Sequence, residues 1–184
     1  MGGDKGPLVT MPAAVMAVND MPTLHLILCG DETLISKYLI QYQLTEHPRL
    51  SIFPTTEVVS MDEKPSSALR GKKNSSMRKS LDLVKEGTAQ ACVSAGNTGA
   101  LFATANYVLK TLVGIERAAL VSSLPTHNEN KHVFMLDLGA NVFCDANILY
   151  QFGIMGSVMA EQVDNIVKPR VALLNMGEED IKGS

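Results

Sequence analysis

One repeating pattern constrains the fold of this chain more than any other feature: an apolar run, then a glycine loop, then a segment with helical periodicity. The apolar runs that begin the copies lie at 24–30, 90–96 and 132–139. They are continuously apolar rather than alternating, as expected for strands covered on both faces. Strands that alternate with helices of this length indicate βαβ units and a mostly parallel sheet. The sequence therefore predicts an α/β fold, a three-layer αβα sandwich formed by residues 1–184 as a single domain.

The other elements follow from the same signals. Further apolar runs predict strands at 50–53, 118–125 and 170–177. Helices are expected after the glycine loops, at 31–44, 97–112 and about 146–163. In the polar stretch 61–79, Pro65 can open one helical turn and Ser75 or Ser76 can cap the next, which Gly87 can end.

Composition excludes several classes of protein. The chain is 46% hydrophobic and 19% charged, a globular balance, and its formal net charge of −3 offers no basic field to nucleic acid. The three cysteines are far apart, and the four histidines have no metal-ligand spacing. The longest uncharged stretch, 146–160, is too short and too polar to span a bilayer. We expect a reduced, cytoplasmic protein with no metal, no cofactor and no nucleic-acid partner.

Four loops are of the kind that leads from a strand into a helix, the place where open parallel sheets bind ligands. They lie at 1–5, 94–99, 137–141 and 176–182. The loop SAGNTG at 94–99 has two glycines that permit close backbone approach, and the following helix offers free N–H groups. These features suit a phosphate or an oxyanion. Any tight turn from strand to helix uses the same residue types, so both interpretations stay open. Neither a P-loop nor a GxGxxG motif is present.

The turn DLGAN at 137–141 places a carboxylate and an amide at the end of a predicted strand. Asp137 and Asn141 could orient a substrate or a basic side chain. Alternatively they brace the turn or cap the next helix, which is the commoner use of such residues. Cys144 is conceivable as an acyl-accepting nucleophile, but no histidine lies near it in the sequence to activate it.

Basic residues supply two further candidates. A basic run is interleaved with Asn74, Ser75 and Ser76, and consists of Arg70, Lys72, Lys73, Arg78 and Lys79. It could contact phosphate or an acidic carrier protein, or it could be the solvated start of a helix. Lys182 lies in the last loop beside acidic residues, where it could supply a cation to the site or be an exposed lysine of the tail.

Both ends of the sequence look cut. The glycine loop at 1–4 is of the kind that follows a strand, yet no strand precedes it. Residues 182–184 come directly after the loop of the last predicted strand. We therefore expect this chain to be the N-terminal part of a longer one.

Six segments together resemble the phosphate acyltransferase (PlsX) family. In chain order they are MGGDKGP (1–7), KKNSSM (72–77), ACVSAGNTGAL (91–101), LDLGANV (136–142), QFGIMGSVMA (151–160) and RVALLNMGEEDIKG (170–183). The resemblance runs from Met1 to the last residues and covers the N-terminal half of that family's chains. It implies a Rossmann-like sandwich similar to that of isopropylmalate dehydrogenases and phosphotransacetylases.

The resemblance also implies an activity: conversion of acyl-[acyl-carrier protein] and inorganic phosphate to acyl phosphate and free carrier protein. Members of that family are homodimers that are cytoplasmic, associate peripherally with the membrane and feed a membrane acyltransferase in phospholipid biosynthesis. In the implied mechanism a phosphate oxygen attacks the thioester, so no protein nucleophile is required. The site must hold phosphate beside the thioester and stabilise the tetrahedral oxyanion.

Site residues are implied as well. Lys182 matches a lysine thought important in the family and is expected to neutralise charge as the catalytic residue. The loop 94–99 is expected to supply backbone donors, with Asp4 and Asn141 shaping the pocket. The full set expected to bind phosphate or substrate is Gly2, Gly3, Asp4, Ser94, Gly96, Asn97, Thr98, Gly99, Asp137, Gly139, Asn141, Lys72, Asn74 and Ser75.

The sequence departs from the family at Phe143, where an aspartate is usual, and at Ala118, where a proline is usual. The C-terminal half of the family's chains is missing as well, so we do not expect this chain to be active by itself. Two other functions are compatible with the fold. One is a phosphotransacetylase or dehydrogenase relative, although a dehydrogenase would need acidic metal ligands and a nucleotide loop that are not evident. The other is a non-catalytic phosphate-binding or assembly module.

Overall fold

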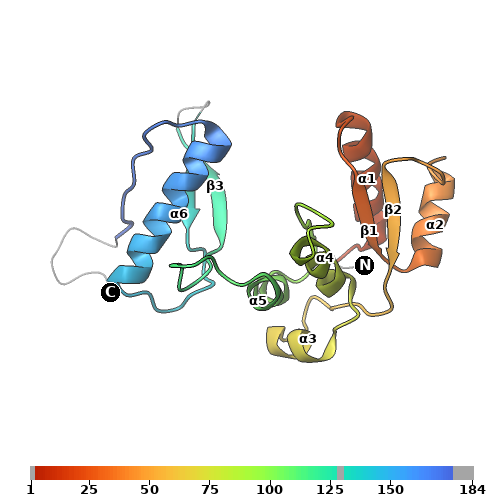
Figure 1. Ribbon diagram of the computed structural model, residues 1–184, viewed down its shortest axis with the longest axis horizontal. Coiled ribbons are helices and arrows are strands. Elements are labelled where there is room, and N and C mark those ends of the chain that lie inside the picture. The colour runs from red at the N-terminus through yellow and green to blue at the C-terminus, as the bar shows by residue number, and fades with distance from the viewer. Residues whose placement is uncertain (1–2, 128–130, 176–184) are drawn as a thin grey trace. The chain divides into compact units, whose positions relative to one another are not determined.

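The computed structural model describes residues 3–127 and 131–175. The chain divides into two compact units, Met1–Lys110 and Thr111–Ser184, which we term the first and second unit. Each unit combines helix with a two-stranded sheet (Figure 1). The fold is therefore α/β, as predicted. That residues 1–184 form a single domain stays a prediction.

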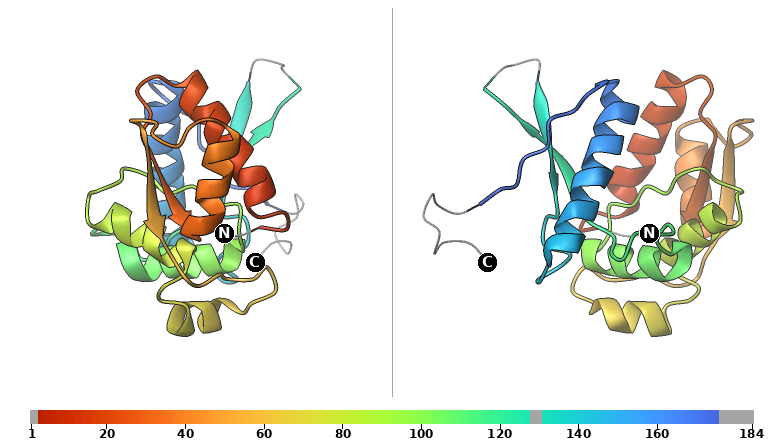
Figure 2. Two further views of the ribbon diagram at one scale, coloured as in Figure 1. Left: turned by 90° about the vertical axis from the view of Figure 1, so that its right-hand side faces the viewer. Right: turned by 60° about the vertical axis from the view of Figure 1, so that its left-hand side comes forward.

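The first unit contains a βαβ motif, and a further helix precedes this motif in the chain. Its elements are α1 (Pro7–Asp20), β1 (Leu26–Gly30), α2 (Glu32–Gln41), β2 (Leu50–Pro54), α3 (Pro65–Gly71), α4 (Ser76–Lys85) and α5 (Thr98–Leu109). Strands β1 and β2 pair in parallel, with Leu26 opposite Leu50. Helix α2 packs against both strands and against α1, so that α1 and α2 lie beside this sheet (Figure 2). The predicted strands at 24–30 and 50–53 are confirmed.

Helix α2 shows how local sequence and packing cooperate. It begins at Glu32 because the Asp31 carboxylate accepts a hydrogen bond from the Leu34 N–H at 2.9 Å. Ile35 and Leu39, one helical turn apart, are buried in a cluster with Met11 of α1. Full burial of such side chains stabilises the fold by about 1.5–3 kcal/mol each. Truncation of Leu39 to alanine would cost about 2–5 kcal/mol.

A second cluster fixes the three helices that surround the candidate site. Ala68 of α3, Met77 of α4 and Ala100 of α5 are buried together with Val59. Ala100 is completely inaccessible to solvent, which holds the beginning of α5 against its neighbours. The predicted helix signals are confirmed in this region: Pro65 opens α3 and the Ser75 hydroxyl caps α4.

The second unit contains β3 (Val121–Pro125), β4 (His132–Leu136) and α6 (Ala146–Asp164), which packs on β4. The two strands are antiparallel, with Val121 opposite Leu136. The prediction that these runs join a parallel sheet is wrong for this pair. The connection at 126–131 is too short for a parallel crossover, which needs about a dozen residues or more. No helix in the described ranges has both the length and the apolarity to cross a membrane.

Two further predictions for strands are wrong in the residues that the structure describes. Residues 91–95 and 170–175 form no strand, and the Val93 side chain is 96% exposed. Residues 176 and 177, the end of the strand predicted at 170–177, lie outside the described ranges. Apolar composition alone cannot make a strand, because a neighbouring strand must supply the hydrogen bonds. Helix α1 was not predicted, although Pro7 occupies a first-turn position that favours a helix start.

Candidate functional site: two glycine turns

The structure brings two of the predicted site loops together within the first unit. Gly3 lies against Ala95, where a Cβ added to Gly3 would be 2.6 Å from the Ala95 carbonyl oxygen. Gly3 also has a φ of +84°, which residues with side chains rarely adopt. A Cβ added to Gly96 would be 3.8 Å from the Gly3 nitrogen. Only glycine at position 3 permits this backbone approach.

A cavity of about 210 Å³ opens beside that contact. A water molecule occupies about 30 Å³ in the liquid, so the cavity has room for a small tetrahedral anion. One wall is formed by a turn in which the Gly6 N–H donates to the Gly3 carbonyl at 3.3 Å. Helix α1 begins directly after this turn. The cavity is lined by Gly3, Asp4, Lys5, Gly6, Val9, Thr10 and Ala95.

The turn 94–99 ends in a helix start with free donors. Asn97 is the N-cap of α5, and its Oδ1 accepts from the Ala100 N–H at 2.9 Å. The N–H groups of Thr98 and Gly99 precede the first hydrogen bonds inside the helix. Within the described part of the chain they donate to no protein acceptor. Two free amides at the positive end of a helix dipole suit an anion.

Other groups in this turn hold it in shape. The Asn97 Nδ2 group donates to the carbonyl oxygens of Met61 and Glu63, both at 2.9 Å, and to Ser60 at 3.2 Å. The Ser94 hydroxyl accepts from the Gly96 N–H at 3.2 Å. The amide of Asn97 therefore clamps the loop 60–63 to the start of α5. The expected part of Asn97 in phosphate binding stays a prediction.

The predicted residues between α3 and α4 also lie in the first unit. Ser75 is 1% exposed, and its hydroxyl donates to the Lys72 carbonyl at 2.7 Å while accepting from the Arg78 N–H at 3.2 Å. The Asn74 N–H donates to the Glu57 carboxylate at 2.7 Å. Ser75 is thus occupied as a cap, whereas Asn74 is exposed and Lys72 is half-buried. Binding roles for these residues stay predictions.

In the second unit, Asp137 is the centre of a closed turn. Its carboxylate accepts hydrogen bonds from the N–H groups of Leu120 (2.8 Å), Ala140 (3.2 Å) and Asn141 (2.6 Å), and from Asn141 Nδ2 at 3.0 Å. Burial by itself would raise the pKa of Asp137, but these hydrogen bonds outweigh it and hold the pKa below its ordinary value. Asn141 Nδ2 also donates to the Ala118 carbonyl at 2.9 Å. The geometry matches the bracing interpretation of Asp137 and Asn141.

Gly139 and Arg117 also contribute to the local structure at this turn and beside it. Gly139 has a φ of +90°, a conformation that the tight turn requires. The Arg117 guanidinium donates to the Phe143 carbonyl at 3.1 Å, and the Phe143 ring is largely exposed. Cys144, the candidate nucleophile, is half-buried.

Another cysteine can be judged directly. Burial, reinforced by the neighbouring Cys92, raises the pKa of the Cys29 thiol to about 11. The thiolate is the reactive form of cysteine, so Cys29 carries almost none of it at neutral pH. Cys29 is therefore a poor nucleophile.

Two predicted site residues, Gly2 and Lys182, lie outside the described residues. Val9 and Thr10, which line the cavity, lie outside the loops predicted from the sequence. The glycine loop followed at once by Pro7 was a signal that could have placed a helix start there. Across 3–127 and 131–175, no three His, Cys, Asp or Glu residues gather as metal ligands.

The chain matches known proteins along its entire length. The family model described as "Fatty acid synthesis protein" matches residues 1–184. A phosphate acyltransferase of Colwellia psychrerythraea is 67% identical over 189 residues, which covers 100% of this chain and 54% of the relative.

Two further relatives carry the same name. The phosphate acyltransferase of Shewanella amazonensis is 55% identical over 184 residues and is covered to 54% of its length. That of Alkalilimnicola ehrlichii is 56% identical over 184 residues and is covered to 53%. Both alignments include 100% of this chain. The chain thus spans about half the length of the curated relatives it matches.

Proposed function

Because this chain belongs to the family of fatty acid synthesis proteins, we propose that the whole protein is a phosphate acyltransferase. It transfers an acyl group from acyl carrier protein to inorganic phosphate and releases acyl phosphate and free carrier protein. Relatives named phosphate acyltransferase, at 53–67% identity along the full chain, support this proposal. The observation that carries it is the cavity beside Gly3 and Ala95, near a helix start with free amides.

The phosphate-binding half of the site is assigned to the first unit. The Thr98 and Gly99 N–H groups supply donors, and the dipole of α5 favours an anion. Gly3 and Gly96 allow the two loops to approach without side chains between them. Asp4, which lines the cavity, shapes the pocket. Such donors are fixed before the reaction, so they need no reorganisation when charge develops.

The reaction needs no covalent enzyme intermediate. A phosphate oxygen attacks the thioester carbonyl carbon, a C–O bond forms, and negative charge develops on the carbonyl oxygen. Collapse of this tetrahedral intermediate breaks the C–S bond, and the departing thiolate takes a proton from the medium. The protein contributes proximity of phosphate and thioester, together with stabilisation of the oxyanion. Lys182, in this proposal, neutralises the developing charge.

The remaining features complete the proposal. The whole protein forms a single Rossmann-like αβα sandwich. It acts as a cytoplasmic homodimer that associates peripherally with the membrane, where acyl phosphate passes to a membrane acyltransferase for phospholipid synthesis. Asn141 and Asp137 act by holding the turn 137–141 in shape.

The test is phosphate-dependent release of thiol from acyl carrier protein. The whole protein is incubated with the acyl carrier thioester, with and without radiolabelled phosphate, and labelled acyl phosphate is separated from free phosphate and counted. Thiol release and labelled acyl phosphate should rise together, and thiol release should require phosphate. Thiol release that is independent of phosphate would reject the proposal. A Lys182→Ala protein with unchanged turnover would remove Lys182 from it.

A further inference from the structure

Charge is strongly segregated along the chain. Residues 64–85 carry a net charge of +6, whereas the chain as a whole carries −3. Within that segment Asp82 is the single acidic residue. Its basic residues are Lys64, Arg70, Lys72, Lys73, Arg78, Lys79 and Lys85. We term the surface formed by these basic residues the basic face.

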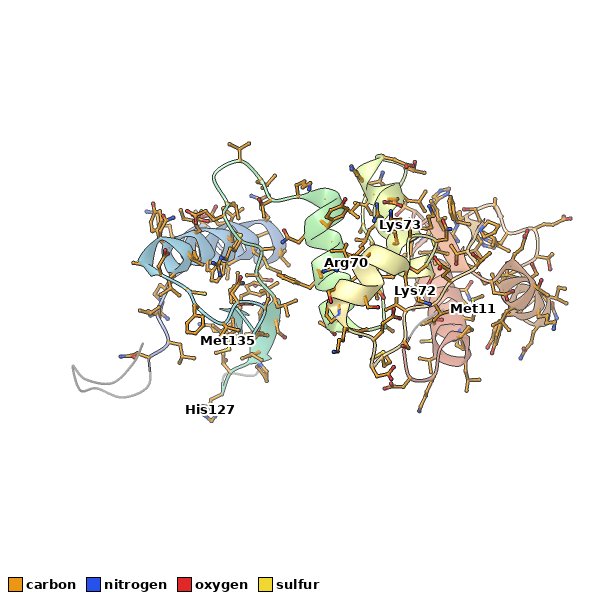
Figure 3. All side chains as sticks on the ribbon, turned by 90° about the horizontal axis from the view of Figure 1, so that it is seen from below. Met11, Arg70, Lys72, Lys73, His127 and Met135 are labelled. Carbon is orange, nitrogen blue, oxygen red and sulfur yellow. The ribbon has the colours of Figure 1, made fainter. Side chains whose placement is uncertain are left out.

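The structure concentrates this charge on two helices of the first unit. The basic face lies on α3, on α4 and on the turns beside them, and both helices pack against α5. Figure 3 shows Arg70, Lys72 and Lys73 close together around the end of α3. Arg78 and Lys79 stand near the start of α4, where the helix dipole adds further positive potential. The charges therefore reinforce one another.

Little of this charge is neutralised within the protein. Asp82 pairs with Arg78 at 2.9 Å and approaches Lys79 at 3.9 Å. In the described ranges Arg70, Lys72 and Lys73 form no ion pair. A cluster of unpaired cations held on packed helices repels itself, and it fits a partner that brings carboxylates.

The composition of the basic face favours a protein over a lipid surface. Membrane-surface helices insert an apolar face between lipids. The large apolar side chains of α4 point inward instead, since Met77, Leu81 and Leu83 are buried. At the edge of the basic face, Tyr107 is 55% exposed, with the Arg78 guanidinium 5.7 Å from its ring centre. Exposed tyrosine beside arginine is typical of protein interfaces.

The basic face is also mechanically joined to the candidate phosphate site. Gly99, whose amide is one of the free donors, lies against Pro65 at the start of α3, where an added Cβ would be 3.1 Å from the proline Cγ. Met77 of α4 lies as close to Gly96, with 3.3 Å from its Cε to an added Cβ. A partner docked on α3 and α4 therefore rests on the helices that position the turn 94–99.

We propose that the basic face is the docking surface for the carrier protein, which it binds through carboxylates on the carrier's own surface. This inference rests on the proposed function for the identity of the partner. The docked carrier delivers its thioester to the site, while Arg70 and Lys73 contribute no atom to the chemistry. Binding is therefore sensitive to salt, and small thioesters do not depend on it.

The test compares two double variants of the whole protein with the same change in charge. Arg70→Ser/Lys73→Ser removes two exposed charges from the basic face, and Lys37→Ser/Lys168→Ser removes two exposed charges elsewhere. The first should raise the Kd for carrier protein and the KM for its acyl thioester by about tenfold, with a smaller salt dependence. Turnover of an acyl-pantetheine thioester should change by less than about twofold in both variants.

Each outcome decides the proposal. Equal Kd values for the two variants would overturn it. So would a loss of acyl-pantetheine turnover in Arg70→Ser/Lys73→Ser that is as large as its loss of turnover with the carrier thioester. So would binding to phosphatidylglycerol vesicles that is lost in Arg70→Ser/Lys73→Ser while carrier affinity stays at the wild-type value. The Kd measurement needs no turnover, so it tests docking even if acyl transfer to phosphate is absent. Turnover with an unchanged Kd would reject docking and leave the proposed function standing.

Discussion

The turns 94–99 and 137–141 look alike in sequence, because each joins an apolar run to a helix through glycine and asparagine. In the structure they differ. The first leaves the Thr98 and Gly99 amides free at a helix start and lies beside a cavity. The second directs the amides of Ala140 and Asn141 onto its own carboxylate.

The difference shows what separates a binding turn from a bracing turn. A carboxylate inside the turn satisfies the local N–H groups, so no donor remains for an external anion. In the first turn, the asparagine cap satisfies the third amide of the helix and leaves two. A second loop then approaches this turn closely at Gly3.

Gly3→Ala should have the largest effect on this contrast. The new methyl group would collide with the Ala95 carbonyl, and the positive φ would be strained. Together these costs amount to about 3 kcal/mol. We expect phosphate affinity, measured by isothermal titration, to fall by more than about tenfold as the loops separate.

Gly87→Ala is the matched control for Gly3→Ala. Gly87 has a similar φ of +76° but has nothing within 4 Å of an added Cβ. It should lose about 1 kcal/mol of stability and keep its phosphate affinity. Equal phosphate affinities in the two variants would show that close approach of the loops is unnecessary.

Asp137→Asn should lower the free energy of unfolding by about 2 kcal/mol at neutral pH, because one oxygen that accepts two hydrogen bonds is replaced by an N–H donor. The folded-state pKa of Asp137 is depressed, so its stabilisation is present above its unfolded pKa and is lost as pH falls through the folded value.

Urea unfolding between pH 7 and pH 3 checks both parts of this prediction. The difference between wild type and Asp137→Asn should be constant down to about pH 5 and shrink below about pH 4. A difference that grows on acidification would contradict the depressed pKa. Phosphate binding should be the same in both proteins.

Asn97→Ser tests the clamp separately from the cap. Serine caps helices about as well as asparagine, but it lacks the amide that reaches the Met61 and Glu63 carbonyls. We expect a loss of about 1 kcal/mol in chemical denaturation, and about 2 kcal/mol for Asn97→Ala, which removes both interactions. Identical losses for serine and alanine would assign the whole effect to the clamp and none to the cap.

Cys144→Ser should have the smallest effect. In the proposed reaction phosphate attacks the thioester directly, so the Cys144 thiol takes no part. The kcat for acyl phosphate formation should stay within about twofold of wild type. A loss of more than about a hundredfold would instead indicate a covalent acyl-enzyme at the second turn.

Particular residues show where sequence reasoning succeeded and where it stopped. Pro65 and Ser75 mark helix starts through local chemistry, and the structure confirms both. The run 91–95 has the composition of a strand, yet it forms none in the described residues. The short connection at 126–131 could have predicted the antiparallel pairing of β3 and β4. The composition of an apolar run does not tell whether its strand pairs in parallel or antiparallel.

The sequence by itself determined the α/β class, most helix positions and the family, because these depend on local propensity, periodicity and residue order. The tertiary structure decided which glycine turn keeps open amides and which encloses its own carboxylate. It also placed Gly3 against Ala95, although the two residues lie near opposite ends of the first unit in the sequence. Such contacts join residues far apart in the chain, so their geometry depends on packing that no local pattern encodes.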